Sequence, residues 1–328
     1  MKVMIDGRPL LRPWMGGVPR LASGLVPALV KALEPDTAVI KTSGLKNGLP
    51  NKLVAALTFL GIISYDQFFA KEHADLLFLP NLEFVGQPKI PYALLVHDMS
   101  FLIEPKWFGW KSRLWHILVK PQTLIKNATH HFAVSETTKR DLIHILGINQ
   151  DKITVIPIGI EMEPPIVGAR LIAPLQQNNR FILSLGGTRK NVECIKTAHA
   201  ELIKNPKYSD VKLKITGTPE LPRPTYPELF ALMRDAAIFC YPSWYEGFGL
   251  PLHEAAHFGT PCIASTSGSL PEIAPSGTRF APPAKPHYWI EAICQALDKP
   301  EDHKTTTTIG NWDEASLLIA KKLRTLAK

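Results

Sequence analysis

The sequence predicts an α/β protein of two domains, each with a parallel sheet covered by helices. Its 328 residues exceed one ordinary domain and suit two of about 150 residues each. Short, wholly apolar runs such as Tyr92–Val96 and Ile238–Tyr241 recur in both halves, as expected of strands buried on both faces. Both halves also repeat the order strand, glycine-containing turn, helix, without an internal sequence repeat. Together these features predict two Rossmann-like domains.

The composition predicts a globular cytoplasmic protein. Hydrophobic residues make up 45% and charged residues 20% of the chain, and no apolar run reaches the roughly 18 residues of a membrane span. Asp6 and Arg8 interrupt the apolar start, so residues 1–11 are expected to enter a strand rather than to form a signal peptide. The four cysteines are widely spaced and are expected to be reduced, small core residues. A net charge of +8 fits an acidic ligand, an anionic membrane surface or nucleic acid.

The pattern of apolar runs and turn residues divides the chain into a first domain (1–160), a proline-rich linker (161–179), a second domain (180–308) and a final helical segment (309–328). Strands are expected at 2–5, 37–41, 74–79, 92–96, 131–134, 153–157, 181–185, 211–217, 238–241, 261–264 and 278–281. Helices are expected from the glycine pair at 16–17 to about residue 31, at 52–60, after Ser135, and at 192–204, 229–237, 252–258, 286–297 and 311–327.

The segment 238–272 carries the strongest signal for a binding site. A buried strand is followed by a glycine-spaced loop, and Pro251 stands where a helix would begin. Loop glycines let backbone N–H groups approach a ligand, and a helix N-terminus favours negative charge. Glu246 and Glu254 flank this predicted anion site with seven residues between them. Because carboxylates repel phosphate, we expect them to hydrogen-bond hydroxyl groups, Glu246 on a sugar and Glu254 on a ribose.

The run PSWYEGFGLPLHEAAHFGTPCIAS resembles the Glu-x7-Glu signature of retaining glycosyltransferases of family 4, which have the GT-B fold. The alternative is a strand–loop–helix corner of another α/β protein with two surface glutamates. The resemblance implies two Rossmann-like domains that face each other across a cleft. It further implies that the second domain binds a nucleotide diphosphate sugar, that the acceptor lies on the first domain, and that the segment 309–328 crosses back to the first domain.

Two turns are predicted to bind the donor diphosphate. Gly16-Gly17 separates the first strand from the first helix, as in a phosphate-binding turn, although a plain turn is the alternative. Arg189-Lys190-Asn191 matches an Arg-Lys-Asn of the family, whose lysine resembles a diphosphate ligand. Two cations beside a glycine turn would neutralise a diphosphate, whereas the alternative is solvated surface charge. The loop residues expected to donate backbone N–H groups to the same diphosphate are Gly247, Phe248, Gly249 and Leu250.

Acceptor and sugar contacts are expected on the first domain. His97-Asp98 follows a buried strand, and family members carry a similar pair with the histidine near the donor sugar. The alternative is a pair that caps the next helix. Trp107 and Arg113 belong to an aromatic and basic segment that we assign to the acceptor side, with core packing of the tryptophans as the alternative. The segment His-Asp-Met-Ser-Phe resembles mannosyltransferase-type members, which favours mannose.

The expected reaction is therefore metal-independent, retaining transfer of a hexose without a cofactor, from a GDP-, UDP- or dTDP-linked sugar to a glycan or lipid-linked glycan. Glu246, His97 and Lys190 are its predicted catalytic residues. The acceptor would place the enzyme at the cytoplasmic face of a membrane. One segment departs from the family, which usually inserts a helix and a strand at 218–227 to bind the base. A catalytically weak partner subunit and a sugar-nucleotide epimerase therefore stay as alternatives, whereas only net charge suggests a nucleic-acid-binding protein.

Overall fold

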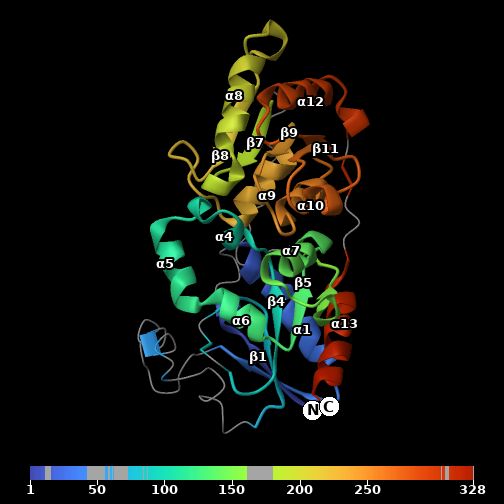
Figure 1. Ribbon diagram of the computed structural model, residues 1–328. Helices are drawn as coiled ribbons and strands as arrows, with labels where there is room; N and C mark the ends of the chain where they lie inside the picture. Colours follow the sequence, from blue (N-terminus) through green and yellow to red (C-terminus); the bar gives the residue numbers. More distant parts are fainter. Residues whose placement is uncertain are drawn as a thin grey trace. The chain divides into compact units, whose positions relative to one another are not determined.

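The structure, a computed structural model, describes residues 1–11, 16–42, 56–57, 60, 62, 73–83, 85–86, 88–160, 180–303, 305–306 and 310–327. The chain divides into two compact units, shown in Figure 1. Unit 1 consists of Met1–Glu161 together with Gly310–Lys328, and unit 2 of Met162–Ile309. The expected linker 161–179 and most of the expected helix 52–60 lie outside the described residues.

Unit 1 is built on a six-stranded sheet with the order β2-β1-β3-β4-β5-β6. All neighbouring strands run parallel, so each connection must cross over a face of the sheet. The order reverses between β1 and β3, which are neighbours although β2 lies between them in the sequence. The strands are β1 (Lys2–Asp6), β2 (Thr37–Lys41), β3 (Leu76–Leu79), β4 (Tyr92–Val96), β5 (His130–Ala133) and β6 (Ile153–Val155).

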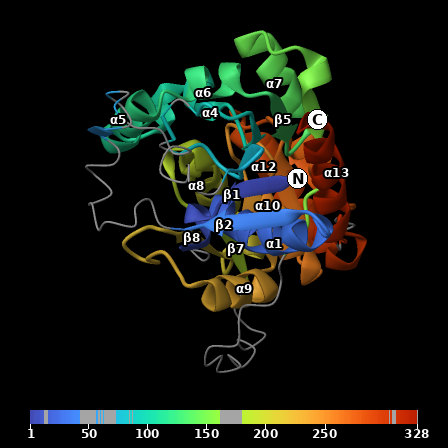
Figure 2. The ribbon, with the colours of Figure 1, turned by 90° about the horizontal axis from the view of Figure 1, so that it is seen from below.

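Helices cover both faces of this sheet, with α6 and α7 on one side and α1 on the other (Figure 2). The last helix, α13, packs along α1, so the two ends of the chain meet in unit 1. Arg324 joins the two helices, because its guanidinium donates to Asp36 Oδ2 at 2.7 Å and to the carbonyl oxygens of Ala32 and Leu33 at the end of α1. The helices are α1 (Gly17–Ala32), α4 (Ser100–Ile103), α5 (Trp110–Val119), α6 (Pro121–Asn127), α7 (Glu136–Leu146) and α13 (Trp312–Leu326).

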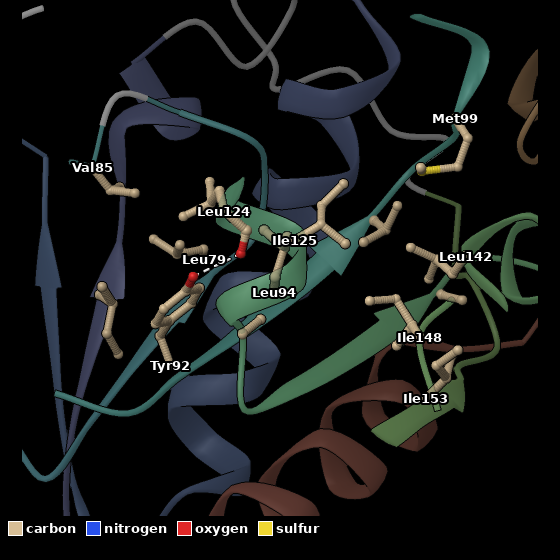
Figure 3. Close-up of a cluster of buried hydrophobic side chains, with 14 of the residues drawn as sticks. Leu79, Val85, Tyr92, Leu94, Met99, Leu124, Ile125, Leu142, Ile148 and Ile153 are labelled. Carbon is tan, nitrogen blue, oxygen red and sulfur yellow. Dashed lines mark hydrogen bonds between the residues drawn. The ribbon is translucent and has the colours of Figure 1, made fainter. Parts of the chain in front are cut away.

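One cluster of buried apolar side chains in unit 1 lies between the sheet and the helices α6 and α7 (Figure 3). Leu94 of β4 packs there with Ile125 of α6 and Leu142 of α7, and all three are fully buried. Tyr92 carries the polar group in this cluster, and its hydroxyl donates to the carbonyl oxygen of Leu124 at 2.7 Å. Because a buried hydroxyl is costly without a partner, this bond ties the start of β4 to α6.

Unit 2 has a five-stranded parallel sheet with the order β11-β10-β9-β7-β8, which reverses between β7 and β9. Alternate residues of its strands face two separate cores: Ile182 packs with α8 and α12, and Leu183 packs with α9 and α10. The strands are β7 (Phe181–Leu185), β8 (Lys212–Thr216), β9 (Ile238–Tyr241), β10 (Cys262–Ser265) and β11 (Arg279–Ala281), and the helices are α8 (Val192–Leu202), α9 (Tyr226–Asp235), α10 (Leu250–His257), α11 (Leu270–Ile273) and α12 (Pro286–Asp298).

Two helices of unit 2 begin earlier than expected from the sequence. α9 begins at Tyr226 rather than near residue 229, because Thr225 and Glu228 form a reciprocal capping box before its apolar residues. α10 begins at Leu250 rather than at residue 252, with Gly249 as N-cap, so Glu254 lies in its second turn and not in its first. The apolar pattern identified both helices, whereas their caps set the starting residues.

Candidate functional site

The site residues of unit 2 follow two neighbouring strands at the point where the strand order reverses. The turn with Arg189 and Lys190 comes directly after β7, and the loop with Glu246 comes after β9. Because β7 and β9 pair in parallel, both segments leave the sheet at its carboxyl edge. In open α/β sheets, this crevice at the reversal point is where ligands bind.

Three charged side chains meet there. Lys190 Nζ lies 2.6 Å from Glu246 Oε1, and Arg189 Nη2 lies 3.4 Å from Glu246 Oε2. Lys190 also donates to the hydroxyl of Tyr241, the last residue of β9. Its ammonium group lies 4.4 Å from the centre of the Tyr241 ring. The structure therefore brings the adjacent cations Arg189 and Lys190 together with Glu246, which lies more than fifty residues further along the sequence.

Burial and charge oppose each other at Glu246, whose side chain is only 7% exposed. Burial alone would raise the pKa of its carboxyl, but the positive charges of Lys190 and Arg189 outweigh it and hold the pKa below the ordinary value. Burial, reinforced by the negative charges of Glu246 and Glu254, raises the pKa of Tyr241. Glu246 is therefore a charged acceptor near neutral pH, and Tyr241 is a neutral donor.

The backbone after β7 is fixed by Asn191 and by Gly186. Asn191 has a left-handed conformation (φ 51°), and its Nδ2 donates to the carbonyl oxygens of Pro242 and Pro283 at 3.1 and 2.6 Å. Gly186 lies so close to β8 that a Cβ would meet the carbonyl oxygen of Thr216 at 2.1 Å. These contacts hold the Arg189-Lys190 turn against the end of β9. The sequence did not predict this structural role of Asn191.

The segment before α11 forms hydrogen bonds to the glycine loop that follows β9. Ser269 donates to the carbonyl oxygen of Glu246 from its backbone N–H and from its hydroxyl, both at 3.0 Å. Gly268 (φ +60°) lies against the Glu246 backbone, where a Cβ would meet its nitrogen at 2.7 Å. The sequence assigned no role to residues 267–272, whereas in the structure they support the backbone of Glu246.

The first residues of α10 complete the loop. Gly249 (φ +98°) is the N-cap of α10 and provides no side-chain cap bond, so the segment Gly247–Leu250, which was predicted to donate backbone N–H groups to a diphosphate, leads directly into the start of this helix. Phe248 stacks on His253 with ring centres 5.4 Å apart, and burial lowers the pKa of His253 to about 4. Glu254 is buried next to His253, and its charge acts on Tyr241, so the two signature carboxylates share one environment.

The predicted residues of unit 1 lie at the carboxyl edge of its own sheet. Gly16 (φ +122°) is the N-cap of α1, and a Cβ on it would meet none of the described residues within 4 Å, while Gly17 is the first residue of the helix. Asp6 ends β1 and holds Arg8 through both carboxylate oxygens, at 2.9 and 2.7 Å. Arg20 was not predicted, although it is a buried cation in the first turn of α1. Its signal was a basic residue on an otherwise apolar helix face.

His97 and Asp98 have different partners after β4. His97 Nε2 bonds the carbonyl oxygen of Pro80 at 2.8 Å, so Nε2 carries the proton and Nδ1 is left as an acceptor. Burial lowers the pKa of His97, which favours this neutral form. Asp98 Oδ1 accepts from the backbone N–H of Ser100 at 2.9 Å, as expected of a helix-capping carboxylate. Asp98 therefore caps the backbone at the start of α4, whereas Nδ1 of His97 can accept a hydrogen bond.

The predicted acceptor residues lie in the segment after α4. Trp107 is half-buried and ends a 3-10 turn, whereas Arg113 is exposed on α5. Arg113 lines a cavity of about 430 Å³ together with Phe101 and His116. Arg113 thus lines a cavity of unit 1, whereas Trp107 is not part of the cavity lining.

Among the described residues, no group of three or more His, Cys, Asp or Glu side chains is arranged to hold a metal ion. His130 and His131 point to separate partners, Thr154 Oγ1 and the carbonyl oxygen of Ile125. In the same part of the chain, no helix combines the length and apolar character needed to cross a bilayer. All four cysteines are free thiols.

Two parallel-sheet units with these turns at their carboxyl edges define the GT-B class of fold. The family model Glycosyltransferase Family 4 matches residues 40–164, and the model Glycosyl transferases group 1 matches residues 179–299. The chain belongs to the glycosyltransferases of this family 4 type.

Relatives with curated names are glycosyltransferases, among them mannosyltransferases and D-inositol 3-phosphate glycosyltransferases. The MMP alpha-(1->4)-mannosyltransferase of Mycolicibacterium hassiacum is 28% identical over 214 residues, which is 58% of this chain and 51% of that protein. O-antigen chain mannosyltransferase B of Escherichia coli is 43% identical over 90 residues, 27% of this chain and 23% of that protein. The chain thus spans about half, or less, of the length of these relatives.

Solved structures share the fold over the whole chain. Sucrose-phosphate synthase from Thermosynechococcus elongatus superimposes with a TM-score of 0.72, 18% identity and 99% coverage of both chains. UDP-GlcNAc 2-epimerase from Neisseria meningitidis gives a TM-score of 0.60 at 17% identity, covering 99% of this chain and 100% of that one. At these identities, the likeness shows the fold alone.

Proposed function

We propose that the protein is a retaining hexosyltransferase that uses a nucleotide diphosphate sugar and acts in cell-surface polysaccharide synthesis. The observation that carries the proposal is the group formed by Lys190, Arg189 and Glu246 at the carboxyl edge of β7 and β9. Two cations and a carboxylate at one point match the two halves of such a donor. The cations suit the diphosphate, and the carboxylate suits sugar hydroxyls.

In the proposed reaction, Lys190 and Arg189 stabilise the negative charge that develops on the leaving diphosphate. The N–H groups of Gly247–Leu250 at the start of α10 add to this stabilisation, with Gly16-Gly17 as the contribution of unit 1. Preorganised donors of this kind are typically worth about 3–4 kcal/mol each. They would serve in place of a resident metal ion.

Glu246 orients the donor sugar, and Glu254 binds the ribose. Because Lys190 and Arg189 keep the carboxyl of Glu246 charged, it can accept hydrogen bonds from two hydroxyl groups at once. Neutral His97 accepts a sugar hydroxyl at Nδ1 while Pro80 holds its other nitrogen. As the family resemblance implies, the acceptor attacks from the face that the diphosphate leaves, and the leaving phosphate takes the acceptor proton.

Mannose is the proposed sugar, and a glycan or lipid-linked glycan is the proposed acceptor. The names of the mannosyltransferase relatives support this choice, as does the segment His97–Phe101. A lipid-linked acceptor would bring the protein to the cytoplasmic face of a membrane.

One observation favours a second candidate, a catalytically weak partner subunit. β8 is the outer strand of the unit 2 sheet, and the chain passes from its end at Thr216 to α9 at Tyr226 through turns and bends. The family usually places a further helix and strand here to contact the nucleotide base. A subunit that has lost base recognition would still fold.

A thermal-shift panel with GDP, UDP, dTDP and ADP, and with their sugars, separates the two candidates. A ligand that binds only the folded protein raises its melting temperature. We expect one nucleotide to stabilise the wild type and the control Lys196→Ala, whose lysine is on the exposed surface of α8, but not Lys190→Ala. Stabilisation by none of them would support the partner subunit instead.

With the donor identified, the stereochemistry of the product tests the mechanism. We expect the anomeric configuration of the transferred sugar to equal that of the donor, as followed by NMR during turnover. An inverted product would exclude the retaining mechanism while leaving donor binding intact. Epimerisation of the donor sugar without any acceptor would favour the epimerase alternative.

A further inference from the structure

Helix α5 of unit 1 carries an apolar face that is exposed to solvent. Trp110, Leu114 and Ile117 follow one another at helical spacing and are 67%, 47% and 65% exposed. Val119, on the opposite side of the helix, is buried, and the His116 ring packs against Phe101 with ring centres 5.1 Å apart. The helix is thus anchored by one side and presents three large apolar side chains on the other.

Positive charge borders this face on both sides. With about 100° of rotation per residue, Lys111 and Arg113 lie on opposite flanks of the row that begins at Trp110. The ammonium group of Lys111 lies 5.6 Å from the centre of the Trp110 ring. Residues 100–127 contain five Lys and Arg but one Glu, so this segment holds half of the net charge of +8.

A cavity of about 430 Å³ opens beside the same face. Phe101, Leu102 and Pro105 form its apolar lining, and Ile117 joins them from α5. Basic side chains, Arg113 and Lys120, lie in the same lining. Figures 1 and 2 both show α5 at the periphery of unit 1, beside α6.

We infer that α5 docks unit 1 on an anionic lipid bilayer, with the helix in the plane of the headgroups. The α5 surface, formed by Trp110, Lys111, Arg113, Leu114 and Ile117, combines the features of an interfacial helix: an apolar row with tryptophan, bordered by cations. This docking rests on the proposed function in one respect, because a lipid-linked acceptor would be presented at the surface of such a bilayer.

Charge distinguishes a bilayer from a protein occupant. A second copy of the chain seated symmetrically on this face would bring Lys111 and Arg113 close to their own equivalents, and like charges repel. Protein interfaces are also depleted of charged residues at their core, and lysine is disfavoured there. Anionic headgroups instead attract each of these cations while the acyl boundary takes up the apolar row.

Vesicle co-sedimentation tests the inference directly. We expect the full chain to bind vesicles of phosphatidylglycerol and phosphatidylcholine but not of phosphatidylcholine alone, and to bind more weakly as salt is added. Two α5 variants should each lower the binding constant at least tenfold: Trp110→Ser with Ile117→Ser, and separately Lys111→Glu with Lys106→Glu, where Lys106 is an exposed cation in the 3-10 turn before α5. Leu317→Ser is the matched control, because Leu317 is 59% exposed on α13, and it should bind like the wild type.

The outcomes separate this inference from the proposed function. The α5 variants should keep the melting temperature and the nucleotide-induced shift of the wild type, and Lys190→Ala should lose the shift but keep vesicle binding. Equal vesicle binding by the α5 variants and Leu317→Ser would overturn the inference. A dimer in analytical ultracentrifugation that the α5 variants dissociate, without any vesicle binding, would assign the surface to a second copy instead.

Discussion

Lys190 Nζ lies 2.6 Å from Glu246 Oε1, and this ion pair joins the turns that follow two neighbouring strands, β7 and β9. Glu246 is buried and Lys190 is half-buried, with side chains that are 7% and 19% exposed. Buried ion pairs contribute little net stability, because both charges lose their hydration. The position of this pair at the reversal point of the sheet therefore fits the proposed ligand-binding role better than a role in stability.

Removal of one partner from this pair should destabilise unit 2. Lys190→Ala leaves the Glu246 carboxylate buried with Arg189 at 3.4 Å. An orphaned buried charge typically costs about 3–5 kcal/mol, and the remaining Arg189 should keep the loss below that range. The double variant Lys190→Met with Glu246→Leu should recover most of the stability but none of the nucleotide-induced shift. Urea unfolding measures the stability of each variant, and thermal unfolding with and without the nucleotide measures the shift. A double variant less stable than Lys190→Ala would contradict the prediction.

Two buried histidines should make the protein less stable in mild acid. Burial lowers the pKa of His130 in unit 1 and of His253 in unit 2, each to about 4. The unfolded chain, with a histidine pKa near 6.5, then binds more protons than the folded one between about pH 6.5 and pH 4. The free energy of unfolding should therefore fall as the pH is lowered through this window, by up to roughly 3 kcal/mol per histidine.

His253→Phe tests the contribution of unit 2 to this pH dependence. Phenylalanine retains a ring to stack on Phe248 and has no group to protonate. We expect the slope of the free energy of unfolding against pH to decrease in this variant, measured in urea between about pH 7 and pH 4. His287→Phe changes an exposed histidine and should leave the slope unchanged. An identical slope in His253→Phe would mean that His253 titrates alike in both states.

The sequence predicted the strands well where both faces of the sheet are covered. The bounds expected for β4, β7 and β9 match the structure, because a run of apolar residues ended by a turn signal has few other solutions in an α/β protein. The bounds of the edge strand β2 also match, although this strand is partly exposed. The bounds of α9 and α10 differed, since capping residues outside the apolar pattern set where a helix starts. The resemblance to family 4 and the GT-B fold were confirmed by the family models and the solved structures.

The supports of the site could not be predicted in the same way. Lys190 meets Tyr241 because β7 pairs with β9, and Ser269 meets Glu246 because the turn after β10 folds beneath the glycine loop. An apolar run indicates that a strand is buried but not which strand lies beside it. The residues Arg189, Lys190 and Glu246 were named from their chemistry, and their roles in binding a donor stay predictions.

The support beneath Glu246 can be tested with a matched pair of glycines. A Cβ on Gly268 would meet the backbone oxygen and nitrogen of Glu246 at 2.6 and 2.7 Å, whereas a Cβ on Gly259 would meet nothing within 4 Å. Both glycines have similar left-handed conformations, with φ of +60° and +73°. Alanine should therefore cost about 1–2 kcal/mol of conformational strain at either position, and displace the Glu246 backbone only at Gly268.

We accordingly expect Gly259→Ala to lower the melting temperature modestly and to keep the full nucleotide-induced shift. Gly268→Ala should lower the melting temperature further and lose most of that shift, because the Glu246 loop must move away from Ser269 and from the cations that face it. Thermal unfolding with and without the stabilising nucleotide measures both quantities. Equal nucleotide-induced shifts in the two variants would show that the Gly268 contact does not position Glu246, and the glycine loop would then owe its geometry to β9 and α10 alone.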